Sequence, residues 1–209
     1  ILARPANGEF MRIGRMLEAG AQGIMYPRCS NAAEAAEVVK WSKFAPLGKR
    51  GFDGSGADMP YCTMPVSDYV QQANENTFIT IQLEEQSAVD QAEEIAAVPG
   101  VDALMLGPAD FSILEGFPGQ FNHPQMQTAI ETIATAAANQ GKHWGMPTFN
   151  LEHAQQLLQR GARMLYHMAD IIFVKNGLEQ MQQQFSQIGF TFENQLKDSA
   201  THYTQGKKS

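Results

Sequence analysis

Two carboxylates follow short apolar runs at matching places in the sequence. Glu84 ends the run Ile79-Thr80-Ile81-Gln82-Leu83, and Asp110 follows a second run that starts at Ala103. Such runs are typical of buried parallel strands, and in parallel α/β folds the reactive groups gather at the carboxyl ends of strands. Oxygen ligands from neighbouring strands suit Mg²⁺ or Mn²⁺, with waters and substrate oxygens completing the shell. The alternative is that Glu84 caps the next helix and Asp110 caps a turn. We predict a metal site at this pair.

Further groups that could bind a substrate lie near the same strand ends. Arg4 follows the first apolar residues, and its guanidinium could hold a carboxylate or stabilise an enolate oxygen, although a lone Arg there also fits a solvated surface. Gln82 lies two residues before Glu84 and so faces the same way on a strand, where it could also be a polar residue of a barrel layer. The backbone N–H groups of Gly107 and Ala109 are expected beside the second carboxylate, in a turn that can bind an anion.

Other candidates are weaker. Arg28 stands at another strand end, Arg50 is expected to pair with a carboxylate inside a long loop, and His167 ends the last predicted strand. The histidines form no metal-binding spacing, and no Ser/His/Asp set is present. No lysine stands at a strand end where a Schiff-base nucleophile is expected. This pattern favours metal-assisted enolate chemistry over a covalent imine route.

The order of the predicted elements indicates the fold class. Strands are expected at 1–3, 23–27, 77–83, 102–106, 143–147 and 163–168. Helices are expected at 8–19, 32–41, 66–74, 86–97, 124–140, 151–160 and 176–188, and a Gly- and Pro-rich loop at 45–65.

This β/α alternation predicts a parallel sheet in a single domain, residues 1–190, followed by a C-terminal tail, residues 191–209. A (β/α)8 TIM barrel has eight such units in about 250 residues. We therefore expect an α/β chain that forms such a barrel but lacks its first two β/α units. Because the chain begins inside a strand and without Met, we also expect that an upstream segment is absent.

Composition narrows the class of partner. The chain has 209 residues, 44% of them hydrophobic, which is enough for one sizeable core. Its net charge of −7 argues against nucleic acid or an anionic membrane as a main partner. No apolar run is long enough to cross a bilayer, and the first residues do not form a signal peptide. Two cysteines without a C-x-x-C pair fit a reducing compartment, so we expect a cytoplasmic location.

Several motifs resemble those of the HpcH/HpaI aldolase family, and the similarity extends from residue 1 to about residue 188. They are Gln82-Leu83-Glu84, Leu106-Gly107-Pro108-Ala109-Asp110-Phe111-Ser112, Pro46-Leu47-Gly48-Lys49-Arg50-Gly51, His123-Pro124 and the segment Glu18 to Pro27. Members of this family are class II aldolases that act on pyruvate and 2-keto-3-deoxy sugar acids with a divalent metal. The resemblance implies a (β/α)8 barrel and a homo-oligomer, a trimer or hexamer, in which the last helix is exchanged between subunits.

The resemblance also implies residue roles. Glu84 and Asp110 would ligate Mg²⁺ or Mn²⁺, and the same oxygen ligands also accept Co²⁺. Arg4 would be the catalytic arginine at the keto oxygen. The groups expected to hold the pyruvate carboxylate or line its pocket are Gln82, Gly107, Ala109 and Pro147.

The sequence departs from the family at its start. The general-base histidine of the family is expected upstream of Ile1, so the base is missing from the given chain. Arg28 occupies a position where relatives carry varied residues, which leaves the aldehyde undetermined. Two other readings remain open. One is a related lyase or decarboxylase that forms an enolate, of the acyl-CoA lyase or oxaloacetate decarboxylase type. The other is a barrel that binds a keto acid without catalysis.

Overall fold

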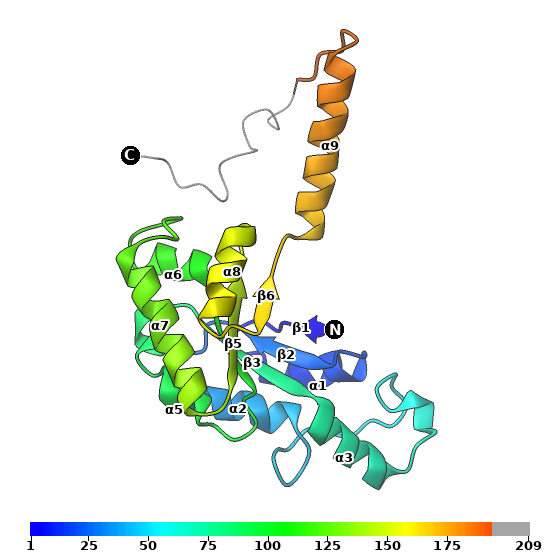
Figure 1. Ribbon diagram of the computed structural model, residues 1–209. Helices are drawn as coiled ribbons and strands as arrows, with labels where there is room; N and C mark the ends of the chain where they lie inside the picture. The colour runs from blue at the N-terminus through cyan, green and yellow to red at the C-terminus, as the bar shows by residue number, and fades with distance from the viewer. Residues whose placement is uncertain (194–209) are drawn as a thin grey trace.

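A computed structural model describes residues 1–193 of the chain, and its centre is one six-stranded parallel sheet (Figure 1). The strands are β1 (Leu2–Ala3), β2 (Gly23–Tyr26), β3 (Phe78–Leu83), β4 (Ala103–Leu106), β5 (His143–Pro147) and β6 (Met164–Tyr166). They lie side by side in sequence order, and each neighbouring pair is parallel. All six predicted strands are therefore confirmed.

Helices connect the strands, as parallel pairing requires. They are α1 (Phe10–Glu18), α2 (Ala32–Ser42), α3 (Val66–Asn76), α4 (Gln86–Val89), α5 (Ala92–Ala96), α6 (Pro108–Leu114), α7 (Pro124–Asn139), α8 (Leu151–Gln159) and α9 (Asp170–Ser186), with a 3₁₀ turn η1 at Pro60–Cys62. Neighbouring helices α1, α2, α5 and α7 pack in succession along the sheet. The predicted order of β/α units is confirmed. The described strands form an open sheet, so closure of an eight-stranded barrel stays a proposal.

The two faces of the sheet carry different side chains. Strand pairing places Ile24 opposite Ile79 and Tyr26 opposite Ile81, and these residues pack with the helices in the main core. The alternate residues of β3, Thr80 and Gln82, lie on the inner face of the half-barrel. Thr80 on this face reaches the sulfur of Met164 in β6 at 3.8 Å. Glu84 continues the inner-facing series just past the end of β3, which explains how a carboxylate comes to be buried there.

Several predicted boundaries were wrong. The single helix expected at 86–97 is two short helices, α4 and α5. The last helix begins at Asp170 rather than 176, directly after Met168 adopts a left-handed backbone conformation (φ 67°). Asp110 lies in the first turn of α6 and not in a loop, because Pro108 begins that helix.

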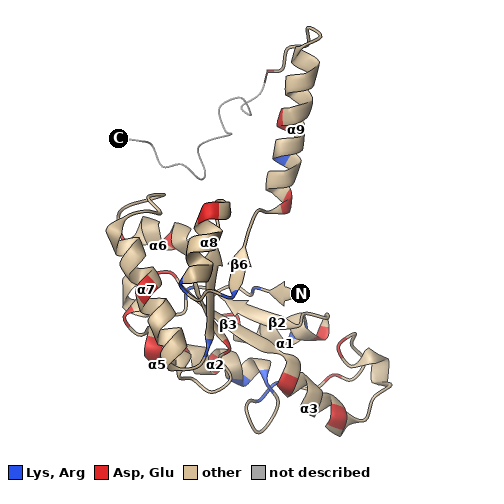
Figure 2. Ribbon diagram, viewed as in Figure 1, with Lys and Arg blue, Asp and Glu red and all other residues tan. Residues whose placement is uncertain are grey.

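The C-terminal helix α9 projects away from the sheet (Figure 1), and none of its residues is buried. Of the predicted tail, residues 194–209 lie outside the described part of the chain. Among residues 1–193, no helix is both long and apolar enough to span a membrane. Over the same residues, Figure 2 shows Lys and Arg dispersed among the elements rather than gathered in one basic patch.

The long loop before α3 is held by an internal ion pair. The Arg50 guanidinium lies 2.6 Å from Asp58 and 3.1 Å from the hydroxyl of Tyr69, and its side chain is only 2% exposed. This confirms that Arg50 has a structural role in the loop, at a distance from the carboxyl ends of the strands.

Candidate functional site

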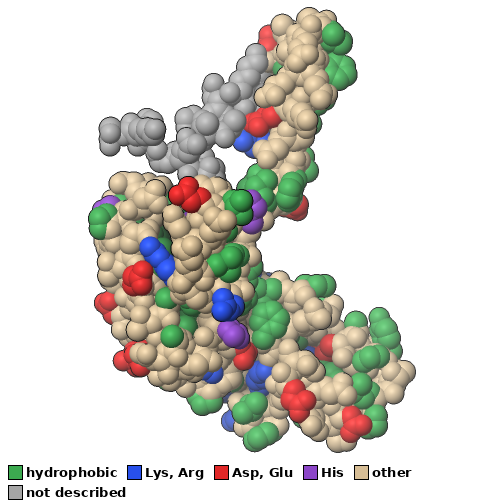
Figure 3. Space-filling model, viewed as in Figure 1, with side chains coloured by type: hydrophobic (Ala, Val, Ile, Leu, Met, Phe, Trp, Pro, Cys, Tyr) green, Lys and Arg blue, Asp and Glu red, His purple; other side chains and the backbone are tan. Residues whose placement is uncertain are grey.

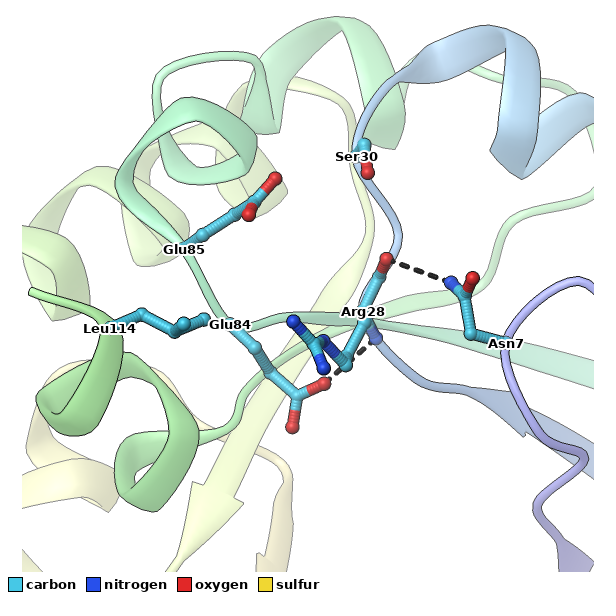
Figure 4. A pocket seen from close by; sticks show the side chains of 6 residues that line it. All are labelled: Asn7, Arg28, Ser30, Glu84, Glu85 and Leu114. Atoms are coloured by element: carbon cyan, nitrogen blue, oxygen red, sulfur yellow. Dashed lines mark hydrogen bonds between the residues drawn. The ribbon is translucent and has the colours of Figure 1, made fainter.

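Glu84 is the most deeply buried group of the predicted site. It follows β3, its residue exposure is 2%, and its Oε2 accepts a hydrogen bond of 2.7 Å from the backbone N–H of Arg28. Figure 4 shows this contact together with the side chains around it. Since Oε2 is engaged by the protein, Oε1 is the oxygen that remains for another partner.

The electrostatics of Glu84 show which neighbours act on it. Burial is the main cause that raises its pKa from the ordinary value of 4.5 to about 7, and the Asp110 carboxylate acts in the same direction. The Arg28 N–H and the Arg4 guanidinium oppose this increase and lower the pKa. The structure therefore brings Asp110 and Arg4 close enough to Glu84 for their charges to matter, as the sequence predicted. Both of these side chains belong to exposed residues at the mouth of the site.

Gly107 makes room for Glu84. A Cβ atom built on Gly107 would lie 2.5 Å from both Cγ and Oε1 of Glu84, which is much closer than such atoms approach. The predicted role for the Gly107 N–H was wrong, because that group donates to the Leu83 carbonyl at 3.0 Å. Gly107 therefore acts through the space that it leaves.

The other predicted substrate-binding residues differ in how deeply they are buried. Gln82 is 6% exposed, and its Oε1 is buried without a hydrogen-bond partner among the described residues. Such an atom is costly to leave unpaired, so it fits a ligand that donates to it or a reoriented amide. Ala109 lies half-buried in the first turn of α6, and Pro147 lies half-buried at the end of β5. Their contact with a substrate stays a prediction.

His167 is already engaged. Its Nδ1 lies 3.0 Å from Oγ1 of Thr148 and 3.2 Å from the Thr148 carbonyl. These contacts join the segments after β5 and β6.

The second-rank candidate Arg28, in contrast, lines a cavity of about 180 Å³ beside Glu84, together with Asn7, Ser30, Glu85 and Leu114.

The site also uses a group that the sequence analysis did not identify. Arg28 contacts Glu84 through its backbone and adopts a left-handed conformation with φ 51°. A positive φ in an arginine has no clear sequence signal, since Asn and Gly are the residues that favour it.

The donor set fits a hard divalent cation. Two carboxylates meet, one of them with a raised pKa, and the glycine beside them leaves a cradle that a Cβ would fill. Among residues 1–193, no group of three or more His, Cys, Asp and Glu side chains is arranged to hold a metal. Mg²⁺ and Mn²⁺ are commonly bound by one or two carboxylates with waters and substrate oxygens, so the pair is sufficient for that kind of site.

Comparison with known proteins shows the family. Residues 4–174 match the HpcH/HpaI aldolase/citrate lyase model, and the chain belongs to that family. It is similar to the 2-keto-3-deoxy-L-rhamnonate aldolase of Escherichia coli (strain K12), with 32% identity over 177 residues, which cover 85% of this chain and 66% of that protein. The chain thus spans slightly less than two thirds of the length of this relative.

Solved structures with the same fold superimpose on this chain. The HpcH/HpaI aldolase from Desulfitobacterium hafniense DCB-2 superimposes with a TM-score of 0.83 and 31% identity, covering 91% of this chain and 74% of that one. A family protein from Burkholderia cenocepacia J2315 gives a TM-score of 0.80 and 30% identity, covering 88% and 73%. Macrophomate synthase gives 0.75 and 25%, covering 90% and 68%. The six-stranded parallel sheet and its helices therefore match a large part of each of these family structures.

Proposed function

We propose that the chain carries the metal- and pyruvate-binding part of an aldol lyase that cleaves a 4-hydroxy-2-oxo acid reversibly into pyruvate and an aldehyde. The observation that carries this proposal is that Glu84, just past β3, and Asp110, in the first turn of α6 after β4, act on each other, with Arg4 acting on the same carboxyl. Similarity to a 2-keto-3-deoxy-L-rhamnonate aldolase supports the substrate class.

Glu84 and Asp110 would hold the cation, which is Mg²⁺ or Mn²⁺ and, from the same oxygen ligands, also Co²⁺. A bound divalent ion supplies Lewis-acid stabilisation of negative charge on the keto oxygen of the substrate. The Arg28 N–H fixes one oxygen of Glu84, so the carboxylate keeps one orientation before any ligand arrives.

The remaining groups act on the substrate directly. The Arg4 guanidinium adds a second positive charge at the oxygen that becomes negative when the carbon–carbon bond breaks. Gln82 is buried on the inner face beside Glu84, and its Nε2 would donate to the pyruvate carboxylate and orient it. The backbone N–H of Ala109 would hold the same carboxylate, and Pro147 would line the substrate pocket. We assign the proton transfer on the aldehyde side to none of residues 1–193.

We also propose that the protein is a homo-oligomer, a trimer or hexamer in which α9 is exchanged between subunits. An apolar stripe follows one side of this helix at heptad-like spacing and continues past its end: Ile171, Val174, Leu178, Met181, Phe185 and Ile188. All six are exposed in the single chain, and Figure 3 shows apolar side chains along this helix. A cytoplasmic location fits the two unpaired cysteines and remains part of the proposal.

Exchange of the pyruvate methyl protons with solvent tests the function. NMR in D₂O with Mg²⁺ should show exchange for the wild type and none for Glu84→Gln or Asp110→Asn, while circular dichroism shows that both variants are folded. Wild-type exchange after exhaustive chelation, or full exchange in either variant, would refute the metal site. A panel of short aldehydes and of oxaloacetate then separates an aldolase from a decarboxylase, and pyruvate binding without exchange would indicate a non-catalytic barrel.

A further inference from the structure

Two loops at the mouth of the site are joined to each other. The loop after β1 carries Asn7, and the loop after β2 carries Pro27 and Arg28. The Asn7 amide Nδ2 donates to the carbonyl of Arg28 at 3.1 Å and to the carbonyl of Pro27 at 3.4 Å. Figure 4 shows the first of these contacts beside the bond from the Arg28 N–H to Glu84. The position of the Glu84 contact therefore depends on how these two loops are held.

The Glu34 carboxylate, in the first turn of α2, is hydrogen-bonded to groups of both loops. Oε1 of Glu34 accepts from the Tyr26 hydroxyl at 2.7 Å and from Nδ2 of Asn7 at 3.2 Å. Its other oxygen, Oε2, accepts from the backbone N–H of Ser30 at 2.8 Å. Both oxygens thus face donors only, and an ionised carboxylate, which is a pure acceptor, is the side chain that satisfies them all.

Tyr26 extends this arrangement to the backbone of the first loop. Its hydroxyl donates to Glu34 and accepts the N–H of Gly8 at 2.8 Å. The ring is fully buried on the helix-facing side of the sheet. Because β2 fixes the ring, the hydroxyl is a fixed point to which the loop after β1 is attached.

The backbone that contacts Glu84 needs such support. Arg28 has φ 51°, a conformation that costs a non-glycine residue free energy unless its surroundings enforce it. The next two amides are both fixed: Cys29 N–H donates to the carbonyl of Gln82 at 3.2 Å, and Ser30 N–H donates to Glu34. The loop is therefore clamped by β3 on one side and by α2 on the other.

We propose that Glu34 and Tyr26 are positioning residues for the candidate metal site, because they set the two loops whose geometry directs the Arg28 N–H onto Glu84. Neither residue lines the cavity beside Glu84, so both act through the backbone between them. The part of the inference that concerns metal affinity rests on the proposed function. The part that concerns the loops does not.

The decisive variant is Glu34→Gln in the 209-residue chain. An amide has one acceptor oxygen and one NH₂ group, so in either orientation a donor faces a donor at Ser30 or at Asn7. We expect the backbone amides of Arg28 and Ser30 to exchange with D₂O about tenfold faster in the metal-free protein. We also expect the affinity for Mn²⁺, measured by electron paramagnetic resonance, to fall about tenfold, as for other residues that orient a metal ligand.

Tyr26→Phe removes only one hydroxyl and is the milder test. It leaves the Gly8 N–H without its acceptor, and we expect a loss of Mn²⁺ affinity of about three- to tenfold. Tyr69→Phe is the matched control, because its hydroxyl is also paired with a carboxylate, Asp58, but in α3 and the long loop before it rather than in the loops that line the cavity beside Glu84. Glu37→Gln is the control on α2, since Glu37 pairs with Lys40. Both controls should keep the wild-type affinity.

The outcomes separate the two proposals. If Glu34→Gln changes neither Arg28 amide exchange nor Mn²⁺ affinity by more than about twofold, the positioning role is refuted. If the wild type does not bind Mn²⁺, the proposed function fails, and amide exchange at Arg28 alone decides the positioning role. Equal loss of affinity in Glu37→Gln or Tyr69→Phe would show a general loss of stability and would also refute it.

Discussion

The Cα of Gly107 lies against the carboxyl group of Glu84, and a methyl group attached to this Cα would lie 2.5 Å from Oε1 of Glu84. Gly107→Ala should therefore push the carboxylate away from its position. We expect Mn²⁺ affinity to fall by about tenfold or more, comparable with the loss of a group that orients a ligand. Titration of Mn²⁺ followed by electron paramagnetic resonance measures this. Unchanged affinity would show that the site does not need the close approach.

Gly14→Ala is the matched control for that variant. Gly14 lies inside α1, and a Cβ atom there would meet no atom within 4 Å. Alanine is the better helix former, so this substitution should stabilise the chain by about 0.5–1 kcal/mol. Its Mn²⁺ affinity should equal that of the wild type.

Stability of the metal-free protein should depend on pH through Glu84. Its folded pKa of about 7 is above the ordinary value of 4.5, so the unfolded chain gives up the proton more readily. The resulting stability is fully present below pH 4.5 and is lost as pH rises to 7, by on the order of 3 kcal/mol. Urea unfolding of the metal-free wild type and of Glu84→Gln at several pH values measures it.

The Glu84→Gln variant should lack this dependence of stability on pH. Saturating Mn²⁺ should act in the opposite direction, since the cation binds the ionised carboxylate, and should raise the unfolding midpoint more at pH 8 than at pH 6. An identical pH dependence in wild type and variant would contradict the assignment of the raised pKa to Glu84.

The two cysteines should differ strongly in reactivity. Burial raises the pKa of the Cys29 thiol to about 12, so almost no thiolate forms near neutral pH, whereas Cys62 is exposed. Iodoacetamide at pH 8 should label Cys62 within minutes and leave Cys29 unlabelled in the folded protein, as peptide mass spectrometry would show. Cys62→Ser should remove rapid labelling, and urea should expose both positions. Fast labelling of Cys29 without urea would show that the loop after β2 opens readily.

The apolar stripe of α9 should control assembly. Val174→Glu with Leu178→Glu places two charges on the stripe, and we expect light scattering to show the oligomer dissociated into monomers. Gln183→Glu adds a charge on the same helix away from the stripe and should leave the mass unchanged. A wild type that is monomeric at micromolar concentration would contradict the proposed exchange of α9.

The sequence was most informative where periodicity and turn chemistry agree. The strand at 143–147 was predicted with its observed bounds, and Asn31 caps α2 as expected, with its side chain accepting the Glu34 N–H at 2.9 Å. The start of α9 was missed because Ile171, Phe173 and Val174 are also typical of a strand. Only the tertiary structure shows that the chain turns at Met168.

The site was predictable to the extent that it depends on strand ends. Glu84 and Asp110 were predicted as a pair from their position after apolar runs, because strand pairing brings such residues together, and their role as metal ligands stays a proposal. The Arg28 N–H and the space at Gly107 were not found, since backbone donors and voids have no residue type of their own. Glu34 did have a signal: Asn31-x-x-Glu34 is the spacing of a capping box. Its carboxylate, however, reaches the Ser30 N–H, one residue before the cap.

The Glu84 contact at Arg28 is made by main-chain atoms, and this separates two tasks at one position. The amide keeps the carboxylate in place, while the side chain extends into the adjoining cavity without taking part in that bond. Substitutions that tolerate the left-handed backbone, such as asparagine or glycine, would preserve the support of Glu84 and alter only the cavity wall. The side chain at position 28 can therefore vary, and with it the shape of the cavity, while the support of Glu84 stays the same.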